Sequence, residues 1–389
     1  MNTVSTLFAG IIMMSAIIFL AFLLKSKYPK YKAGKVNLFS SALVLLMTLA
    51  IISVFPGCKD NNIPIKIKKK YVWAVGDVDS TNHGTILFSS DGGATWTQQG
   101  TNCAALSGIS VSDVWAVDEN TVWVIGNKDL ILKTTDGGLN WTQITPPDQK
   151  SNTDLNTISI VGKDDVWIST SNGQVFHSTD GGAHWTDLES DVLGNNFLQG
   201  IHAIDANVVY VAGNDNQSGF IARTTDGGQT WDSIVPSPGL RSHPPIGIAA
   251  TDINHVVVYG GAAHYMMTTN GGQSWVNDSI LNTGGGGTGG SDINCMKMLD
   301  PQTWWGALDL NNIFLTENAG SNWVSQSPDL GGNMFLLGID YYDRDLCVIV
   351  GSSAGYPFHG EILRTTDGGQ TWKLVKQTNI GMWKVSFIK

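Results

Sequence analysis

The octet TTDGGQTW occupies Thr224–Trp231 and recurs unchanged at Thr365–Trp372. Its variants are SSDGGATW at Ser89–Trp96, TTDGGLNW at Thr134–Trp141, STDGGAHW at Ser178–Trp185, TTNGGQSW at Thr268–Trp275 and TENAGSNW at Thr316–Trp323. The seven copies begin 44 to 49 residues apart. A period of this length is typical of one four-stranded propeller blade, so the sequence predicts seven blades.

Each octet has the residues of a tight turn. Two glycines supply positive φ, the third residue accepts backbone N–H groups through its side chain, and the first hydroxyl reinforces it. The tryptophan that ends the octet is expected to bury its ring between blades. The third residues are Asp91, Asp136, Asp180, Asp226, Asn270, Asn318 and Asp367, and the tryptophans are Trp96, Trp141, Trp185, Trp231, Trp275, Trp323 and Trp372.

A β-branched and aromatic run precedes every octet and predicts a strand in each blade. Its third position is large and apolar in most copies, which indicates core packing; the residues are Trp73, Trp123, Trp167, Tyr210, Val257, Trp305 and Cys347. In the third repeat we expect strands at 157–161, 165–170, 174–178 and 185–188, with the octet as the turn between the last two. Cys347 is therefore interpreted as a core residue and not as a nucleophile.

The two ends of the repeat region are expected to meet. The first repeat begins at the strand of Tyr71 with no strand before it, whereas Met382–Ile388 is a strand left over after the seventh repeat. Pairing the two would hide an open sheet edge. The prediction is an all-β, seven-bladed propeller over residues 71–389, made of four-stranded antiparallel blades and closed by the C-terminal strand.

These octets resemble the Asp-box (BNR) repeat over residues 71–389. Sialidases, xyloglucan-degrading glycosidases, sortilin-type receptors and photosystem II stability/assembly factors share that repeat. A single ring with seven TTDGGxTW boxes is most similar to the last of these. The resemblance implies a non-enzymatic assembly platform in a membrane context, and it does not by itself imply photosynthesis.

Charge divides the chain into two parts. Residues 1–70 contain ten lysines and one acid, whereas residues 71–389 contain 13 Lys and Arg against 32 Asp and Glu. A domain this acidic repels phosphate backbones, which argues against a nucleic-acid partner.

The N-terminus predicts a membrane attachment in three parts. Residues 1–38 hold an apolar run at 7–24 and a lysine-rich loop expected in the cytoplasm, and residues 39–58 are a second apolar run that ends at Cys58. Residues 59–70 are a polar spacer. Two interpretations of the second run stay open: a signal peptide cleaved before a lipidated Cys58, or an uncleaved anchor. Translation from Met13 or Met14 is an alternative for the first run.

Catalysis finds little support in the sequence. Of four arginines in the propeller, Arg223 and Arg364 each precede a box and could form a basic cluster, but the sialidase signature is absent. A glycosidase needs two facing carboxylates, which 32 acids do not by themselves establish. The oxygen-rich segment 77–82 lacks the glycine and the distal glutamate of an EF-hand loop, and 213–216 is a similarly weak candidate, so both are interpreted as solvated turns. We therefore predict no enzyme, no cofactor and no metal, with a secreted carbohydrate-active enzyme as the alternative.

Partner binding is expected at the channel and on the face formed by the loops between blades and the loops between second and third strands, of which 233–245, 278–292 and 352–360 are the longest. The loops at 233–245 and 352–360 offer Arg241, His243, Tyr356, Phe358 and His359 as interface residues. His202 and Lys297 lie on inner strands and are expected near the channel, although packing around ordered water would equally account for them. The sequence predicts a membrane-tethered scaffold that faces the periplasm or cell surface and binds a protein or a surface glycan.

Overall fold

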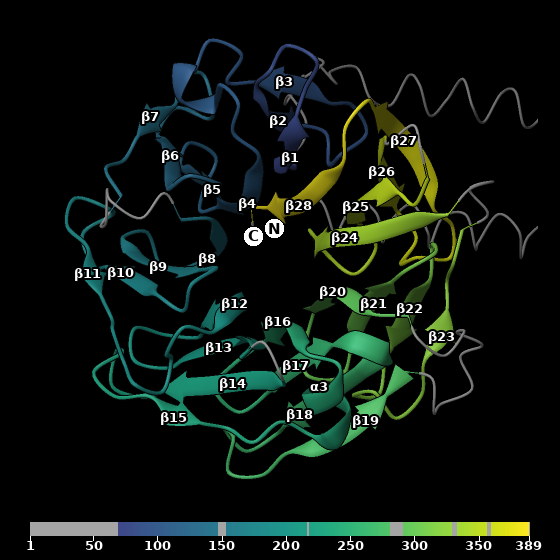
Figure 1. Cartoon of the computed structure of the whole chain (residues 1–389). Helices are drawn as coiled ribbons and strands as arrows, with labels where there is room; N and C mark the ends of the chain where they lie inside the picture. The colour runs from purple at the N-terminus through teal and green to yellow at the C-terminus, as the bar shows by residue number, and fades with distance from the viewer. Residues whose placement is uncertain are drawn as a thin grey trace, which may run out of the picture. The chain divides into compact units, whose positions relative to one another are not determined.

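The structure is a computed structural model that describes residues 69–146, 153–215, 218–280, 291–328, 333–355 and 359–388. Within these residues the chain forms seven four-stranded antiparallel sheets. Figure 1 shows the sheets as blades around a common centre, with β4, β8, β12, β16, β20, β24 and β28 innermost. The predicted fold class is confirmed.

Each blade has four strands, and the blades are numbered 1 to 7 in the chain order of their second strands. The innermost strands of blades 1 to 7 are β28 (Met382–Phe387), β4 (Val111–Ala116), β8 (Leu155–Val161), β12 (Phe197–Ala203), β16 (Pro245–Ala250), β20 (Ile293–Met298) and β24 (Met334–Tyr341). The second strands are β1 (Val72–Val78), β5 (Val122–Gly126), β9 (Asp165–Thr170), β13 (Val209–Asn214), β17 (Val256–Gly260), β21 (Trp304–Leu308) and β25 (Cys347–Ser353).

The outer half of each blade is shorter. The third strands are β2 (Gly84–Ser89), β6 (Leu130–Thr134), β10 (Val175–Ser178), β14 (Gly219–Thr224), β18 (His264–Thr268), β22 (Ile313–Thr316) and β26 (Gly360–Thr365). The outer strands are β3 (Thr97–Gln99), β7 (Thr142–Gln143), β11 (Thr186–Asp187), β15 (Asp232–Ser233), β19 (Val276–Ser279), β23 (Val324–Ser325) and β27 (Lys373–Thr378). The described helical turns are η1 (Ala104–Leu106), α3 (Pro238–Ser242) and η2 (Gly261–Ala263).

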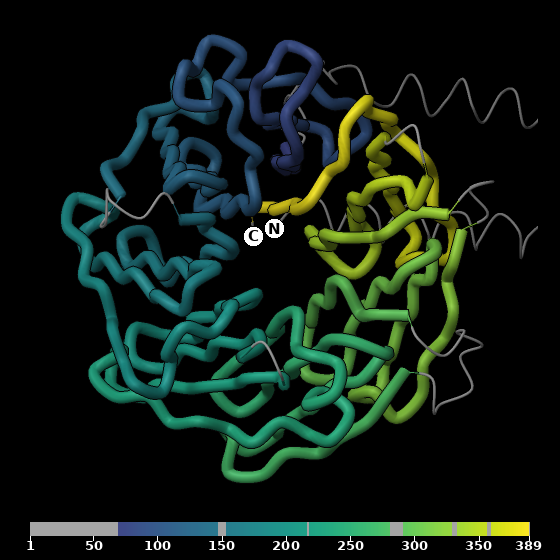
Figure 2. The backbone as a smooth tube through the Cα atoms, viewed as in Figure 1, coloured from purple at the N-terminus to yellow at the C-terminus, as the bar shows by residue number. Residues whose placement is uncertain are grey.

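The last strand closes the ring as predicted. β28 pairs antiparallel with β1, with Val72 opposite Phe387 and Val75 opposite Lys384. Figure 2 shows this C-terminal segment, in yellow, reaching the centre beside the purple first blade. Phe387 is 2% exposed and packs among residues of blades 1 and 7. Closure therefore joins segments from the two ends of the propeller sequence through both backbone pairing and a shared core.

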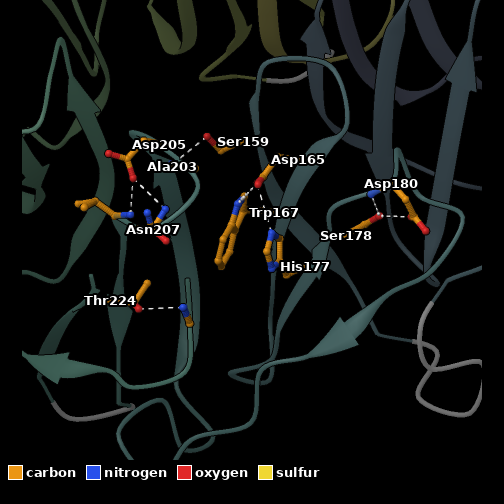
Figure 3. Close-up of polar contacts among 12 residues, drawn as sticks. Ser159, Asp165, Trp167, His177, Ser178, Asp180, Ala203, Asp205, Asn207 and Thr224 are labelled. Carbon is orange, nitrogen blue, oxygen red and sulfur yellow. Dashed lines mark hydrogen bonds and ion pairs between the residues drawn. The ribbon is translucent and has the colours of Figure 1, made fainter. Parts of the chain in front are cut away.

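The octets form the turn between the third and fourth strands, with the bonds that their residues predict. In blade 1, Ser89 Oγ donates to Asp91 Oδ1 at 2.7 Å, and the Thr95 amide donates to the same oxygen at 2.9 Å. Figure 3 shows the equivalent contacts of Ser178 and Asp180 in blade 3. Hydrogen bonds from the backbone and ring of His184 lower the pKa of Asp180 to about 2. The turn therefore stabilises the charged carboxylate.

Positive φ explains the glycines of the box. Gly92 and Gly93 have φ of 71° and 83°, a region that disfavours other residues. The sixth box places Ala319 at φ 54° in the first of these positions. The turn still forms there, because Thr316 Oγ1 and Asn318 Oδ1 make the same bonds as in the other boxes.

Boxes also join neighbouring blades. At six of the seven junctions, a side chain of one blade donates a hydrogen bond to a box carbonyl of the next. The bonds are Gln99 to Gly137 (2.9 Å), Lys133 to Gly181 (3.0 Å), Arg223 to Gly271 (2.5 Å), Tyr265 to Gly320 (3.3 Å), Gln326 to Gly368 (3.0 Å) and Arg364 to Gly92 (2.7 Å). We call this contact the box clasp. Arg223 and Arg364 hold neighbouring blades together in this way, and do not form a basic cluster.

The large apolar residues of the second strands pack between blades. Trp73, Trp123 and Trp167 are fully buried, and each belongs to a cluster that includes residues of the next blade. Box tryptophans flank the same clusters; Trp141, for example, packs against residues of blades 1 and 2. The box tryptophans thus pack between blades as expected, but only Trp231 and Trp323 are buried, and the other five are partly exposed.

One alignment made from sequence is wrong by one residue. Trp73 lies opposite Phe88, the residue before its box, but the residue opposite Arg364 in blade 7 is Val348 and not Cys347. Cys347 instead lies opposite Thr365 and points into the cluster shared with blade 6. It is fully buried, and burial raises the pKa of its thiol well above the usual value. The interpretation of Cys347 as a core residue therefore holds, although its place in the repeat was misassigned.

The predictions for the N-terminus fall outside the described residues. These are the apolar runs, the spacer up to 68 and the lipidation of Cys58. In the part of the chain that the structure describes, no helix has the length and apolarity needed to cross a membrane.

Ring closure can be tested with Phe387→Ala. The substitution removes a buried ring between blades 1 and 7, so we expect it to lower the free energy of unfolding of the full-length chain by about 3–5 kcal/mol. The measurement is chemical denaturation followed by circular dichroism. The matched control is Leu374→Ala on β27, where the side chain is 45% exposed, and there we expect a change within about 0.5 kcal/mol. Equal effects of the two variants would contradict closure by β28.

Candidate functional site

The two faces of the ring are distinct, and the boxes define one of them. The amide of the first box glycine, or of Ala319 in blade 6, donates to a carbonyl just before the second strand, which in blades 2 to 7 lies in the turn from the inner strand. The acceptors are Lys70, Asn120, Asp164, Asn207, Asn254, Gln302 and Asp345. These turns and the boxes therefore share one face, which we call the box face. The connections between blades and the turns between second and third strands lie on the opposite face, the loop face.

The connection from blade 4 to blade 5 lies on the loop face and contains α3. Ser237 caps α3 by accepting the Leu240 amide at 3.3 Å, and Pro238 stands at the first helical position, where its missing N–H costs nothing. Leu240 is fully buried and anchors the turn. Arg241 and His243 are exposed, and the His243 ring lies 6.2 Å from the ring of His264 on β18. Arg241 and His243 were predicted from sequence, whereas His264 was not.

The second predicted group is only partly described. The amide of His359 donates to Ser353 Oγ at 3.0 Å, and its Nε2 lies 3.3 Å from Glu361 Oε1. His359 belongs to blade 7, so it does not share a blade junction with Arg241 and His243. Tyr356 and Phe358 lie outside the described residues.

The central channel runs between the seven inner strands. It encloses about 500 Å³, a size within the usual range of ligand sites. Both His202 and Lys297 line it, as expected from sequence, together with Asp113, Asp340 and Lys384. The structure thus brings His202 and Lys297 together in one cavity and leaves Arg241, His243 and His359 on the loops.

The two channel carboxylates bind backbone and lysine groups of the ring itself. Asp340 is 2% exposed, accepts the Phe387 amide of blade 1 at 2.8 Å, and lies 3.4 Å from Lys297 Nζ. Asp113 accepts the amides of Val114 and Ile158 at 2.8 and 3.1 Å. Burial raises the pKa of Asp113, and the positive charges of Lys384 and Lys297 oppose that rise. Both carboxylates therefore help to join one inner strand to the next.

The thiol of Cys295 also lines the channel, and burial keeps it in the unreactive protonated form. Cys295 is 3% exposed, and burial raises its pKa to about 12. A thiol with such a pKa is almost entirely protonated at neutral pH, and the thiolate is the nucleophilic form.

Seven β-bulges surround the loop-face end of the channel, a feature that the sequence analysis missed. In every blade the pairing of the first and second strands skips one residue near the start of the inner strand. The skipped residues are Ser112, Asn156, Gln199, Ile246, Asn294, Leu337 and Trp383. No single residue type is common to all seven, so no sequence signal marks them. All are partly exposed, because a bulge re-aims its side chain away from the regular pleat.

The segments interpreted as solvated turns behave as such. Asp79 Oδ1 accepts the Thr81 and His83 amides at 2.8 and 3.2 Å, while Asp79 Oδ2 accepts Gln98 Nε2 at 2.9 Å. Asp215 likewise accepts the Ser218 amide at 2.6 Å. Over the described ranges, His, Cys, Asp and Glu nowhere gather in a group of three that could hold a metal.

A partly buried histidine in blade 3, His177, makes a further polar contact that the sequence did not predict. Figure 3 shows Asp165 between the Trp167 indole N–H and His177 Nε2, the latter at 3.2 Å. The His177 ring stacks on Trp167 with centroids 3.7 Å apart. Burial lowers the pKa of His177, although the carboxylate of Asp165 opposes the change. His177 occupies the pre-box position that holds clasp donors in blades 2, 4 and 7.

The fold and the box turns define a seven-bladed BNR-type propeller. The family model described as photosynthesis system II assembly factor YCF48 matches residues 105–242. The chain is similar to the photosystem II assembly lipoprotein Ycf48 of Trichormus variabilis, with 29% identity over 276 residues that cover 69% of this chain and 74% of that protein.

Two solved structures have the same fold. YCF48 bound to D1 peptide matches with a TM-score of 0.53 and 22% identity over 68% of this chain and 82% of that one. YCF48 from Cyanidioschyzon merolae matches with a TM-score of 0.57 and 18% identity over 78% of this chain and 97% of that one. At these identities the likeness concerns the fold alone.

The role of the channel ion pair can be tested with Lys297→Met. This variant leaves Asp340 buried without its cation, so we expect it to lower the free energy of unfolding by about 1–3 kcal/mol. The expected loss is below that of a fully buried pair because the Lys297 side chain is 31% exposed. The measurement is a double-mutant cycle by chemical denaturation.

Asp340→Asn is the matched background for that cycle, because an amide oxygen can still accept the Phe387 amide. Lys297→Met should cost much less in that background, since no buried charge is then left unpaired. An equal cost in both backgrounds would show that the pair does not stabilise the ring.

Proposed function

We propose that this chain is a non-enzymatic scaffold, tethered to a membrane by its N-terminus on the outer side, that binds a protein partner on its loop face. The partner surface centres on Arg241 and His243. The observation that carries the proposal is the anchored geometry of α3, which presents these side chains to solvent from a buried base.

The α3 turn has the properties of a preorganised interface element. Its base is fixed by the fully buried Leu240 and by the Ser237 cap, so little conformational entropy is lost when a partner binds. Arginine is among the residues that contribute most at protein interfaces, through planar hydrogen bonds and stacking. The neighbouring imidazoles of His243 and His264 add further donors and acceptors on the same surface.

Similar proteins support a protein partner and a membrane attachment. The relative from Trichormus variabilis is named an assembly lipoprotein, and one solved relative is named as bound to a D1 peptide. A peptide-binding role on the loop face of this propeller is consistent with both names. The lysine-rich N-terminus and Cys58 supply the features that a lipoprotein attachment needs.

The alternative, a carbohydrate-active enzyme, has less support from the channel. Glycoside hydrolysis needs one carboxyl group as acid and another as base or nucleophile. Asp113 and Asp340 are the carboxylates that line the channel, and both accept backbone amides that join inner strands. Recruiting either for proton transfer would disturb the contacts between blades.

The loop-face proposal predicts the outcome of crosslinking in native membranes. We expect Arg241→Ala and His243→Ala to reduce the capture of the partner by about five- to thirtyfold, since each removes an exposed interface anchor. The measurement is quantitative mass spectrometry of proteins crosslinked to the tagged full-length chain.

Lys163→Ala is the matched control for that experiment. Lys163 lies on the box face, where its side chain is 71% exposed and pairs with Asp118 at 3.1 Å. The control should capture as much partner as the wild type. Loss of the partner from the Lys163 variant, or full capture by the Arg241 and His243 variants, would place the interface elsewhere.

The tether predicts a second outcome. If Cys58 carries the lipid, Cys58→Ser should remove the lipid mass from the N-terminal peptide and leave the apolar run at 39–58 uncleaved, because cleavage takes place before a lipidated cysteine. The measurement is mass spectrometry of the N-terminal peptide of the chain purified from membranes. Alanine in place of Cys103 is the control, and it should leave the mass of the N-terminal peptide as it is in the wild type. A wild-type chain with an unmodified Cys58 would favour the uncleaved anchor.

A further inference from the structure

Two lysines and a hydroxyl supply the central channel with hydrogen-bond donors, and each of its two carboxylates accepts a backbone amide of the ring. Lys297 Nζ has three protons and contacts one carboxylate, that of Asp340, at 3.4 Å. Lys384 lines the same cavity and, among the described residues, has no carboxylate oxygen within 4.0 Å. Ser386 Oγ accepts the Ala116 amide at 3.0 Å, which leaves its own O–H to donate. Asp113 and Asp340 already accept the amides described above.

The two lysines of this cavity are positively charged, whereas the propeller region as a whole is acidic. The propeller region contains 32 acids and 13 basic residues, yet its channel is lined by equal numbers of lysines and aspartates. Asp340 pairs with Lys297, whereas Lys384 acts on Asp113 only through a longer-range electrostatic interaction. A cavity with these donors and, among the described residues, a lysine without a carboxylate oxygen within 4.0 Å favours a ligand that is an anion and a hydrogen-bond acceptor.

The size and walls of the channel favour an organic anion over a mineral one. The volume of about 500 Å³ far exceeds that of an inorganic ion. Apolar groups complete the lining, among them the partly exposed Trp115 and Ile246. Ile246 is also one of the bulged residues at the loop-face end, which places an apolar group where the channel opens.

We propose that the channel binds the carboxylate of an organic ligand, with Lys384 as the principal cation and Lys297 and Ser386 as further donors. The site goes beyond the partner surface at Arg241 and does not depend on it. A small carboxylic acid or an acidic side chain of a polypeptide would present the same chemistry, and the test separates these sources.

The experiment is isothermal titration calorimetry on the full-length chain at low ionic strength. The probes are succinate, the peptide acetyl-Gly-Asp-Gly-amide, its Asn counterpart and inorganic phosphate. We expect succinate or the Asp peptide to bind more tightly than phosphate, and the Asn peptide to bind at least about tenfold more weakly than the Asp peptide, because the charge is lost. Tighter binding of succinate assigns a small molecule as the source, and tighter binding of the Asp peptide assigns a polypeptide.

The variants test the residues of the site. Lys384→Met should weaken binding of the carboxylate probe by about tenfold or more, whereas Lys384→Arg should keep it within about threefold. Lys373→Met, on the exposed outer strand β27, is the matched control and should bind as the wild type does. Thermal unfolding of each variant checks that the ring is intact, and Ser386→Ala gives a second test if Lys384→Met does not fold.

Three results would overturn the proposal. They are the absence of binding by both carboxylate probes up to about 10 mM, binding of phosphate as tight as that of either carboxylate, and equal affinity in wild type and Lys384→Met. Because the crosslinking experiment uses loop-face variants with an intact channel, failure of either proposal leaves the other open to its own test.

Discussion

The hydrogen bond between one blade and the box carbonyl of the next is the contact on which the ring depends. A propeller blade buries its two faces against its neighbours, so its stability requires both neighbours to stay in register. The box turn makes this register specific, because its glycines expose a backbone carbonyl at a fixed point. Gln99, Lys133 and Arg364 differ in chemistry, yet each reaches that carbonyl in the next blade. The acceptor is therefore the carbonyl of the first box glycine at five junctions and that of Gly320 at a sixth, while the donor varies.

The two faces of the molecule differ in how regularly their contacts repeat. On the box face, the box of every blade donates a hydrogen bond to the segment just before the second strand. In blade 2, for example, the amide of Gly137 donates to the carbonyl of Asn120. On the loop face the connections differ in length, and one of them contains α3. Variation on the loop face does not disturb the repeated bonds on the opposite side. A fixed ring with variable loops is a common arrangement for binding surfaces.

The repeated elements could be predicted from sequence because local chemistry determines them. The Asp-Gly-Gly turn needs positive φ and a capping acceptor, and the closing strand was marked by an unpaired strand at each end. The box clasps could not be predicted, since a donor such as Tyr265 is separated from its acceptor Gly320 by more than a full repeat and shares no residue type with the other donors. The misassignment of Cys347 has a related cause. Cys347 and Val348 are adjacent and both apolar, so the sequence does not show which of them lies opposite the residue before the box; the strand pairing does.

The candidate site was predictable in part for similar reasons. His202 and Lys297 were placed near the channel because they lie on inner strands, and strand order alone brings inner strands together. The bulges were not predictable, because a bulge depends on how the inner strand pairs with the second strand. No residue type is common to the seven bulges, and neither Gly200 beside one bulge nor Ile246 in another marks the position from sequence. The neighbourhood of His243 and His264 likewise depends on the path of the connection around α3, which contains no repeat.

Closure by the final strand has a consequence for biosynthesis. β28 is the inner strand of the first blade, but a ribosome synthesises it after the other strands of the propeller. Until its residues emerge, β1 lacks its inner partner, and the growing chain carries an open sheet edge from its first blade onward. A nascent or prematurely terminated chain is thus an open arc and not a smaller ring. Quality control that recognises exposed strand edges could distinguish the finished protein from every shorter product.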